Sequence, residues 1–249
     1  MVLTTTQAFS SVDKTPGNAI DPISVPERLL LGPGPSNAHP DVLEALALQP
    51  VGHLDPFYIK LMAEVQDLLR NAWQTNNRLT LPMSGTGSAA MEATIANIVE
   101  PEDIVLVGIK GYFGHRLAEM ASRYRANVQI IEKGWGQAFS LSELEAALQK
   151  YKPSVLALVH AETSTGVCQP MEGIGELCRK YNCLLILDTV TSLGGVPLFL
   201  DEWKIDLAYS CSQKGLSCPP GLGPFSMNKR AENKMSNRKD KVPNWYLDV

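Results

Sequence analysis

The chain has 249 residues, a formal net charge of −4 and 19% charged residues. At roughly 150 residues per domain this is one large domain or one and a half, enough to bury a core without disulfides or metal. The ordinary globular composition excludes a disordered, coiled-coil or collagen-like chain, and the weak negative charge offers no field for nucleic acid or an anionic membrane.

Irregular sequence comes first. Residues 1–26 contain several prolines that break helices, and they lack both the early positive cluster and the long apolar segment of a secretory signal. Leu29–Asn37 (LLLGPGPSN) then carries a short apolar run into a Gly/Pro loop. No apolar run reaches the length of a membrane span. We therefore expect an irregular N-terminal arm over residues 1–28, no membrane partner and a cytoplasmic location.

Helices and strands alternate from residue 57 onward. The alternation predicts an α/β fold, with a mainly parallel sheet covered by helices on both faces. Right-handed crossovers place the C-terminal ends of such strands at one edge, where ligands bind. The expected helices are Phe57–Trp73, Thr86–Val99, Gly114–Tyr124, Leu141–Lys150 and Met171–Tyr181; the expected strands are Leu79–Met83, Ile104–Val107, Val128–Ile131, Val155–Val159, Leu184–Leu187 and Leu207–Ser210, which closes the series.

The segment Ser84–Ala93 (SGTGSAAMEA) places a Gly/Ser/Thr loop directly before a helix. Free backbone N–H groups, the helix dipole and nearby hydroxyls suit a phosphate group, although a plain helix cap explains the same hydroxyls about half the time. Gly85, Gly87 and Ala90 also match a dinucleotide fingerprint. We disfavour that alternative, because no second strand ending in a lone acidic residue follows at the required distance.

Two charged residues follow buried strands near the end of the series. Asp188 ends the apolar strand in LLILDTVTSLGG, where a carboxylate is costly without a cationic or N–H partner. Lys214 stands in YSCSQKGLSCPPGLG, between an apolar strand and a Gly/Pro turn. An alternative for Asp188 is a structural cap of its own loop. Together with the phosphate-like loop, the two residues match the needs of pyridoxal phosphate, which requires a lysine, a carboxylate and an anion site.

These motifs, with ETSTGV at 162–167, resemble the class V pyridoxal-phosphate-dependent aminotransferases, and within them the alanine–glyoxylate branch. The resemblance runs from about Leu29 to Asp248. It implies the large domain of a fold-type I transferase over residues 29–228. It also implies pyridoxal 5'-phosphate as cofactor, small amino acid and 2-oxo acid substrates, and a homodimer.

The resemblance also assigns roles to residues. It makes Lys214 the lysine that forms the Schiff base and Asp188 the partner of the cofactor ring nitrogen. The remaining positions implied are Thr86, Gly87, Ser88 and Gln213 at the phosphate, Phe113 stacked on the ring, Thr163 beside the ring oxygen, and Gly34 on the substrate side. Many relatives have Trp at the position of Phe113 and His at the position of Ser88. Both differences keep the role of the position, a flat aromatic ring in the first case and a hydrogen-bond donor in the second.

The resemblance predicts an amino transfer from alanine or serine to glyoxylate by a ping-pong mechanism. Alternatives are another class V activity, such as serine–glyoxylate or serine–pyruvate transamination, and a catalytically silent form of the fold. Family members continue well beyond Val249, so we expect residues 229–249 to begin a linker to a small C-terminal domain that is missing here. The sequence predicts no metal site, and its cysteines form no CxxC pair; they are Cys168, Cys178, Cys183, Cys211 and Cys218.

Overall fold

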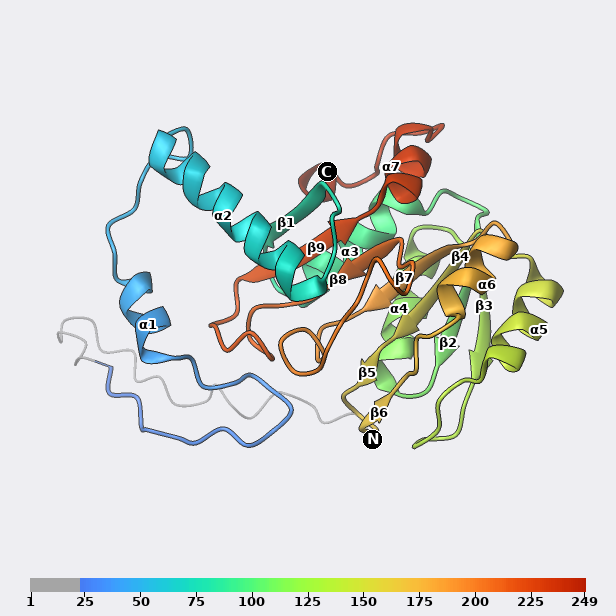
Figure 1. Cartoon of the computed structure of the whole chain (residues 1–249), viewed down its shortest axis with the longest axis horizontal. Coiled ribbons are helices and arrows are strands. Elements are labelled where there is room, and N and C mark those ends of the chain that lie inside the picture. Colours follow the sequence, from blue (N-terminus) through green and yellow to red (C-terminus); the bar gives the residue numbers. More distant parts are fainter. Residues whose placement is uncertain (1–22) are drawn as a thin grey trace, which may run out of the picture.

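A seven-stranded sheet forms the centre of the protein (Figure 1). The computed structural model describes residues 23–249, so the arm predicted over residues 1–28 lies largely outside the described residues. In the order β1-β9-β8-β7-β4-β2-β3, only β9 runs antiparallel to its neighbours. The strands are β1 (Leu79–Ser84), β2 (Ile104–Ile109), β3 (Asn127–Glu132), β4 (Val155–Val159), β7 (Leu184–Asp188), β8 (Leu207–Tyr209) and β9 (Leu222–Met227).

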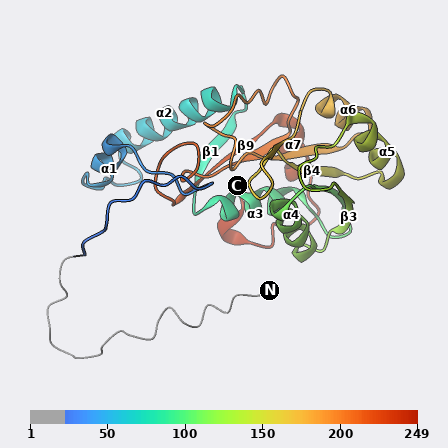
Figure 2. The same cartoon turned by 90° about the horizontal axis from the view of Figure 1, so that it is seen from below.

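Helices cover both faces of this sheet, as predicted. Seen from below, α3 and α4 lie on one side, and α2, α5 and α6 lie on the other (Figure 2). Apolar residues alternate along the strands, so each face packs its own core. The helices are α1 (Pro40–Leu46), α2 (Pro56–Trp73), α3 (Gly87–Ile98), α4 (Tyr112–Arg123), α5 (Leu141–Tyr151), α6 (Ile174–Lys180) and α7 (Lys229–Ser236), with a short 3₁₀ turn at Trp245–Leu247.

The strand series does not close at residue 210, because β9 follows. Its sequence LGPFSM contains Gly223 and Pro224, two residues that are rare inside strands, so sequence patterning predicts a loop there. Pro224 stands opposite Pro82 of β1, which places the two missing amide donors at one point of the ladder. A Cβ on Gly223 would lie 2.8 Å from Ala90 Cβ, so the glycine lets α3 pack closely on β9.

Two smaller differences concern the segment before β7. The helix expected at Met171–Tyr181 is shorter, because Gly173 has a φ of 82° and ends the turn that precedes α6. A two-stranded hairpin, β5 (Ala161–Glu162) with β6 (Val167–Cys168), was not predicted. Because β1 runs in the same direction as β8, the C-terminal ends of six strands still meet at one edge of the sheet.

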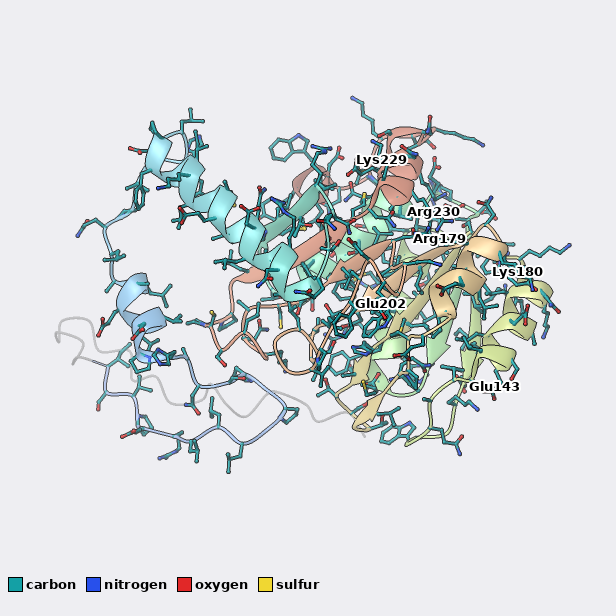
Figure 3. All side chains as sticks on the ribbon, in the orientation of Figure 1. Glu143, Arg179, Lys180, Glu202, Lys229 and Arg230 are labelled. Atoms are coloured by element: carbon teal, nitrogen blue, oxygen red, sulfur yellow. The ribbon has the colours of Figure 1, made fainter. Side chains whose placement is uncertain are left out.

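An ion pair joins α7 to the sheet. Arg230, labelled in Figure 3, donates to both carboxylate oxygens of Asp206 at 3.0 and 2.9 Å. The same carboxylate is fully buried and also accepts from the N–H of Leu185 and the side-chain amide of Asn228, each at 2.8 Å. The pair therefore neutralises a buried charge and fixes α7 beside β8.

Replacing Arg230 with methionine is expected to lower the free energy of unfolding by about 3 kcal/mol, because it leaves the Asp206 carboxylate buried without its cation. Denaturant unfolding measures the effect. The control is Lys180→Ala, which removes an exposed partner of Glu145 and should change stability far less, because solvent screens the pair. Equal losses in the two variants would contradict the structural role of the pair.

Candidate functional site

A cavity of about 190 Å³ opens where β7 and β8 end. Seven of the residues that the sequence assigned to a cofactor site line this cavity: Thr86, Gly87, Ser88, Phe113, Asp188, Gln213 and Lys214. A larger hollow of about 570 Å³ lies near Tyr124 and Arg238, but no buried carboxylate is among the residues that line it. The smaller cavity is therefore the candidate site.

Asp188 is the last residue of β7, and its side chain is buried at 3% exposure. Its Oδ1 accepts from the N–H of Val190 at 2.8 Å, and its Oδ2 accepts from the hydroxyl of Tyr209 at 2.7 Å. Burial raises the pKa of this carboxyl to about 6, against these two hydrogen bonds. A buried, partly uncompensated carboxylate that lines a cavity is suited to binding a cationic group.

The start of α3 forms the opposite wall. Thr86 is the N-cap residue, yet its side chain makes no capping hydrogen bond, so its hydroxyl is free for a ligand. A Cβ on Gly87 would lie 3.0 Å from Cys211 Cβ, so the glycine lets the helix start approach the strand ends. Among the described residues, the buried Oε1 of Gln213 has no partner. Free N–H groups and two hydroxyls fit a phosphate group. The unpartnered Oε1 is an acceptor, so Gln213 would contact a phosphate through its side-chain NH₂ group.

Lys214 lies beneath the N-terminal Gly/Pro loop. Its Nζ donates to the carbonyl oxygen of Pro33 at 2.9 Å. Two further bonds tie the loop down, since the Ser36 N–H donates to Gln213 O and the Ser36 hydroxyl donates to Lys214 O, both at 2.9 Å. A Cβ at Gly34 would collide with the Lys214 side chain, and Gly34 has a φ of 122°. Gly34 therefore borders the lysine, although it is not among the residues that line the cavity; its place on the substrate side stays a prediction.

Gly34→Ala is expected to lower turnover by about 100-fold, because the new methyl group displaces the Lys214 amine from its position. Alanine is also strained at a φ of 122°, so some loss of stability accompanies the change, although the loop lies outside both cores. The matched control is Gly136→Ala, which also has a positive φ, 89°, and where a Cβ meets nothing within 4 Å. Steady-state kinetics on both variants checks this; equal turnover in the two would contradict the contact.

Phe113 reaches the cavity from the first turn of α4. The N-cap residue Gly111 supplies no side-chain cap; instead Ser164 Oγ accepts from Tyr112 N–H at 2.9 Å and Glu162 Oε1 from Phe113 N–H at 3.4 Å. These contacts fix the start of the helix and thus the half-buried aromatic ring. Thr163 is not among the residues that line the cavity; its hydroxyl lies 2.6 Å from that of Thr191, which follows the lining residue Val190.

Sequence reasoning missed four residues that line the cavity: Met91, Arg116, Val190 and Cys211. Arg116 carries a cation into it. Its guanidinium carbon lies 4.8 Å from the centre of the Phe113 ring and 5.5 Å from that of Tyr112. The sequence did contain a signal for Arg116. It follows Phe113 by three residues on α4, and residues at this spacing lie on the same face of a helix.

Comparisons with known proteins identify the family of this chain. Residues 30–240 match the family model described as "Aminotransferase class-V". Mouse alanine–glyoxylate aminotransferase is 47% identical over 228 residues, which is 92% of this chain and 55% of the relative. The chain thus spans about half the length of the curated relatives it matches.

Two solved structures give the same result. Alanine–glyoxylate aminotransferase from Nostoc sp. superimposes with a TM-score of 0.92 and 64% identity, covering 93% of this chain and 61% of that one. Ureidoglycine–glyoxylate aminotransferase from Bacillus subtilis gives 0.89 and 40%, covering 91% and 58%. The predicted fold class is confirmed. The protein belongs to the class V aminotransferase family.

Proposed function

We propose that the protein is an aminotransferase that uses pyridoxal phosphate to move an amino group from alanine or serine to glyoxylate. One observation carries the proposal: a buried carboxylate, a lysine and a free helix N-terminus line the same cavity. The family, whose enzymes depend on pyridoxal phosphate, supports the cofactor. The likeness to alanine–glyoxylate aminotransferases supports the substrates.

The residues around the cavity match the parts of the cofactor. Thr86, Gly87 and Ser88 would bind its phosphate through hydroxyls and backbone N–H groups, with Gln213 as a further contact. The Phe113 ring would pack on one face of the pyridine ring.

The other contacts lie at the ring edge. The Asp188 carboxylate would bind the ring nitrogen, and the Thr163 hydroxyl would lie beside the ring oxygen. The carboxylate whose burial is uncompensated thus gains a cationic partner.

When bound, pyridoxal phosphate supplies a carbonyl group that binds amines covalently and a protonated ring that stabilises negative charge at the substrate Cα. Asp188 keeps the proton on the ring nitrogen. Lys214 provides the amine that attaches the cofactor and, once released, acts through Nζ as the base that moves the Cα proton. The Pro33 carbonyl, which accepts from Nζ at 2.9 Å, orients that amine.

The proposal includes a second copy of the chain and a division into an arm (1–28), a cofactor-binding domain (29–228) and a C-terminal segment (229–249). That segment was predicted to begin a linker, but its Arg230, Ala231 and Leu247 pack on the cofactor-binding domain. Large exposed apolar side chains concentrate before residue 69, as expected for a surface that another subunit covers. Examples are Leu29, Leu31, Leu46, Leu48, Leu54 and Phe57. Light scattering of the purified protein tests the dimer. Within residues 23–249, no helix is both long and apolar enough to cross a bilayer; the cytoplasmic location stays a prediction.

The direct test is a titration of the purified protein with pyridoxal phosphate, followed by visible absorbance. We expect a new absorption band, and then keto-acid formation from alanine or serine at fixed glyoxylate, whose ratio gives the preferred donor. Binding without turnover would favour the catalytically silent alternative. Binding of a nicotinamide dinucleotide, with no response to pyridoxal phosphate, would overturn the proposal.

A further inference from the structure

The buried hydroxyl of Tyr209 makes a hydrogen bond to Asp188. Tyr209 is the last residue of β8, fully buried, and it stands in register beside Asp188 at the end of the neighbouring parallel strand. Adjacent residues of paired strands point to the same face of the sheet, which brings the two side chains together. The Tyr209 hydroxyl donates to Asp188 Oδ2 at 2.7 Å.

This contact completes the orientation of the carboxylate. The Val190 N–H binds Oδ1 and the Tyr209 hydroxyl binds Oδ2, so both oxygens are held from the protein side. Each carboxylate oxygen can accept more than one hydrogen bond, which leaves capacity toward the cavity that Asp188 lines. Rotation of the carboxylate away from the cavity would break a hydrogen bond in a fully buried place.

The groups around Asp188 shift the pKa of its carboxyl in opposite directions, and the Tyr209 hydroxyl is one of them. Burial raises the pKa of Asp188, and the nearby Glu162 of β5 raises it further. The Tyr209 hydrogen bond is the largest influence that lowers this pKa. The Val190 N–H and Arg116 of α4 lower it as well. Burial, followed by the nearby Asp188 charge, raises the pKa of Tyr209 well above its ordinary value. The phenol therefore stays protonated and remains a donor.

We propose that Tyr209 is a positioning residue that keeps the Asp188 carboxylate ionised and directed into the cavity, so that it can bind a cationic ring nitrogen. The inference rests on the proposed function, because it assumes that such a ring occupies the cavity. Tyr209 acts through Asp188. Without the hydroxyl, Asp188 becomes more basic and competes more strongly with the ring nitrogen for their shared proton.

Tyr209→Phe tests this with two readouts that do not depend on turnover. The affinity of the apoprotein for ¹⁵N-labelled pyridoxal phosphate should fall by about tenfold to a hundredfold, as expected for loss of a hydrogen bond to a charged group. The ¹⁵N resonance of the bound ring should move toward that of unprotonated pyridine. The matched control is Tyr124→Phe, which removes a 2.9 Å hydrogen bond to the Glu92 carboxylate away from the cavity and should change neither readout.

A double-mutant cycle separates positioning from packing. In the Asp188→Asn background, Tyr209→Phe should change the affinity for pyridoxal phosphate by less than about twofold, because that background lacks the carboxylate through which Tyr209 acts. An equal loss in both backgrounds would assign Tyr209 to packing and overturn the inference. So would an unchanged ¹⁵N resonance in the single variant.

A second replacement covers the case in which Tyr209→Phe does not fold. Incorporation of 3-fluorotyrosine at position 209 keeps the ring and makes the hydroxyl a stronger donor. The ¹⁵N resonance should then move toward the protonated form, and a resonance equal to that of the wild type would overturn the inference. Wild-type protein that binds no pyridoxal phosphate would instead refute the proposed function, and the inference with it.

Discussion

Lys214→Ala is expected to lower amino transfer by at least about 10⁴-fold, because it removes both the covalent attachment point and the base that moves the Cα proton. The Lys214 amine is the only lysine amine among the residues that line the cavity, so no neighbour replaces it. Initial rates with alanine and glyoxylate measure the loss. Borohydride reduction followed by peptide mass spectrometry should locate the cofactor on residue 214 in the wild type and nowhere in the variant.

Lys180→Ala is the control for this substitution. Lys180 is an exposed residue of α6, labelled in Figure 3, and it pairs with Glu145 at 2.6 Å outside the cavity. We expect wild-type turnover and a wild-type covalent adduct from it. If Lys214→Ala still formed the adduct at the wild-type level, the assignment of the lysine would be wrong.

The sequence was sufficient to predict residues that the fold brings to one cavity. Asp188 and Lys214 follow apolar runs, and a charged side chain at the end of a buried strand is costly enough to require an explanation. The Gly/Ser/Thr segment before α3 was recognisable because its glycines and hydroxyls are neighbours in the chain. Local sequence therefore carries both the elements and the charged residues that distinguish this edge of the sheet.

Contacts between distant segments could not be predicted in this way. Tyr209 ends an apolar strand, so its ring indicates only packing; its hydroxyl gains a role because β8 pairs with β7 and brings it beside Asp188. The approach of Pro33 to Lys214 joins residues 181 positions apart. Strand β9 was missed because burial between β1 and β8 overrides the poor strand propensity of its Gly-Pro pair.

Asp188→Asn is expected to lower amino transfer by at least about 100-fold while some cofactor stays bound. A neutral amide keeps the shape of the carboxylate but cannot hold a proton on the ring nitrogen, so a preorganised charge is lost from the reacting centre. Single-turnover rates and the absorbance of the bound cofactor separate slow chemistry from poor binding. Near-normal turnover with a full complement of cofactor would contradict the role given to this carboxylate.

The same substitution should change how the stability of the apoprotein depends on pH. Burial raises the pKa of Asp188 from 3.8 to about 6, so between these values the native state binds more protons than the unfolded state. Stability from this group is therefore present at low pH and falls as the pH rises through 6, by about 2–3 kcal/mol in all. Asp188→Asn should remove that slope.

His160 contributes the opposite slope, since burial lowers its pKa to about 4, and its stabilising contribution is lost as the pH falls. Both proteins share His160, so the difference between their denaturant unfolding curves from pH 4 to 8 isolates Asp188. A difference that stays constant across this range would show that the carboxylate is not strained by burial. Burial of the Asp188 carboxylate would then not require a cationic partner. The main physical argument for a protonated ring beside Asp188 would therefore fail.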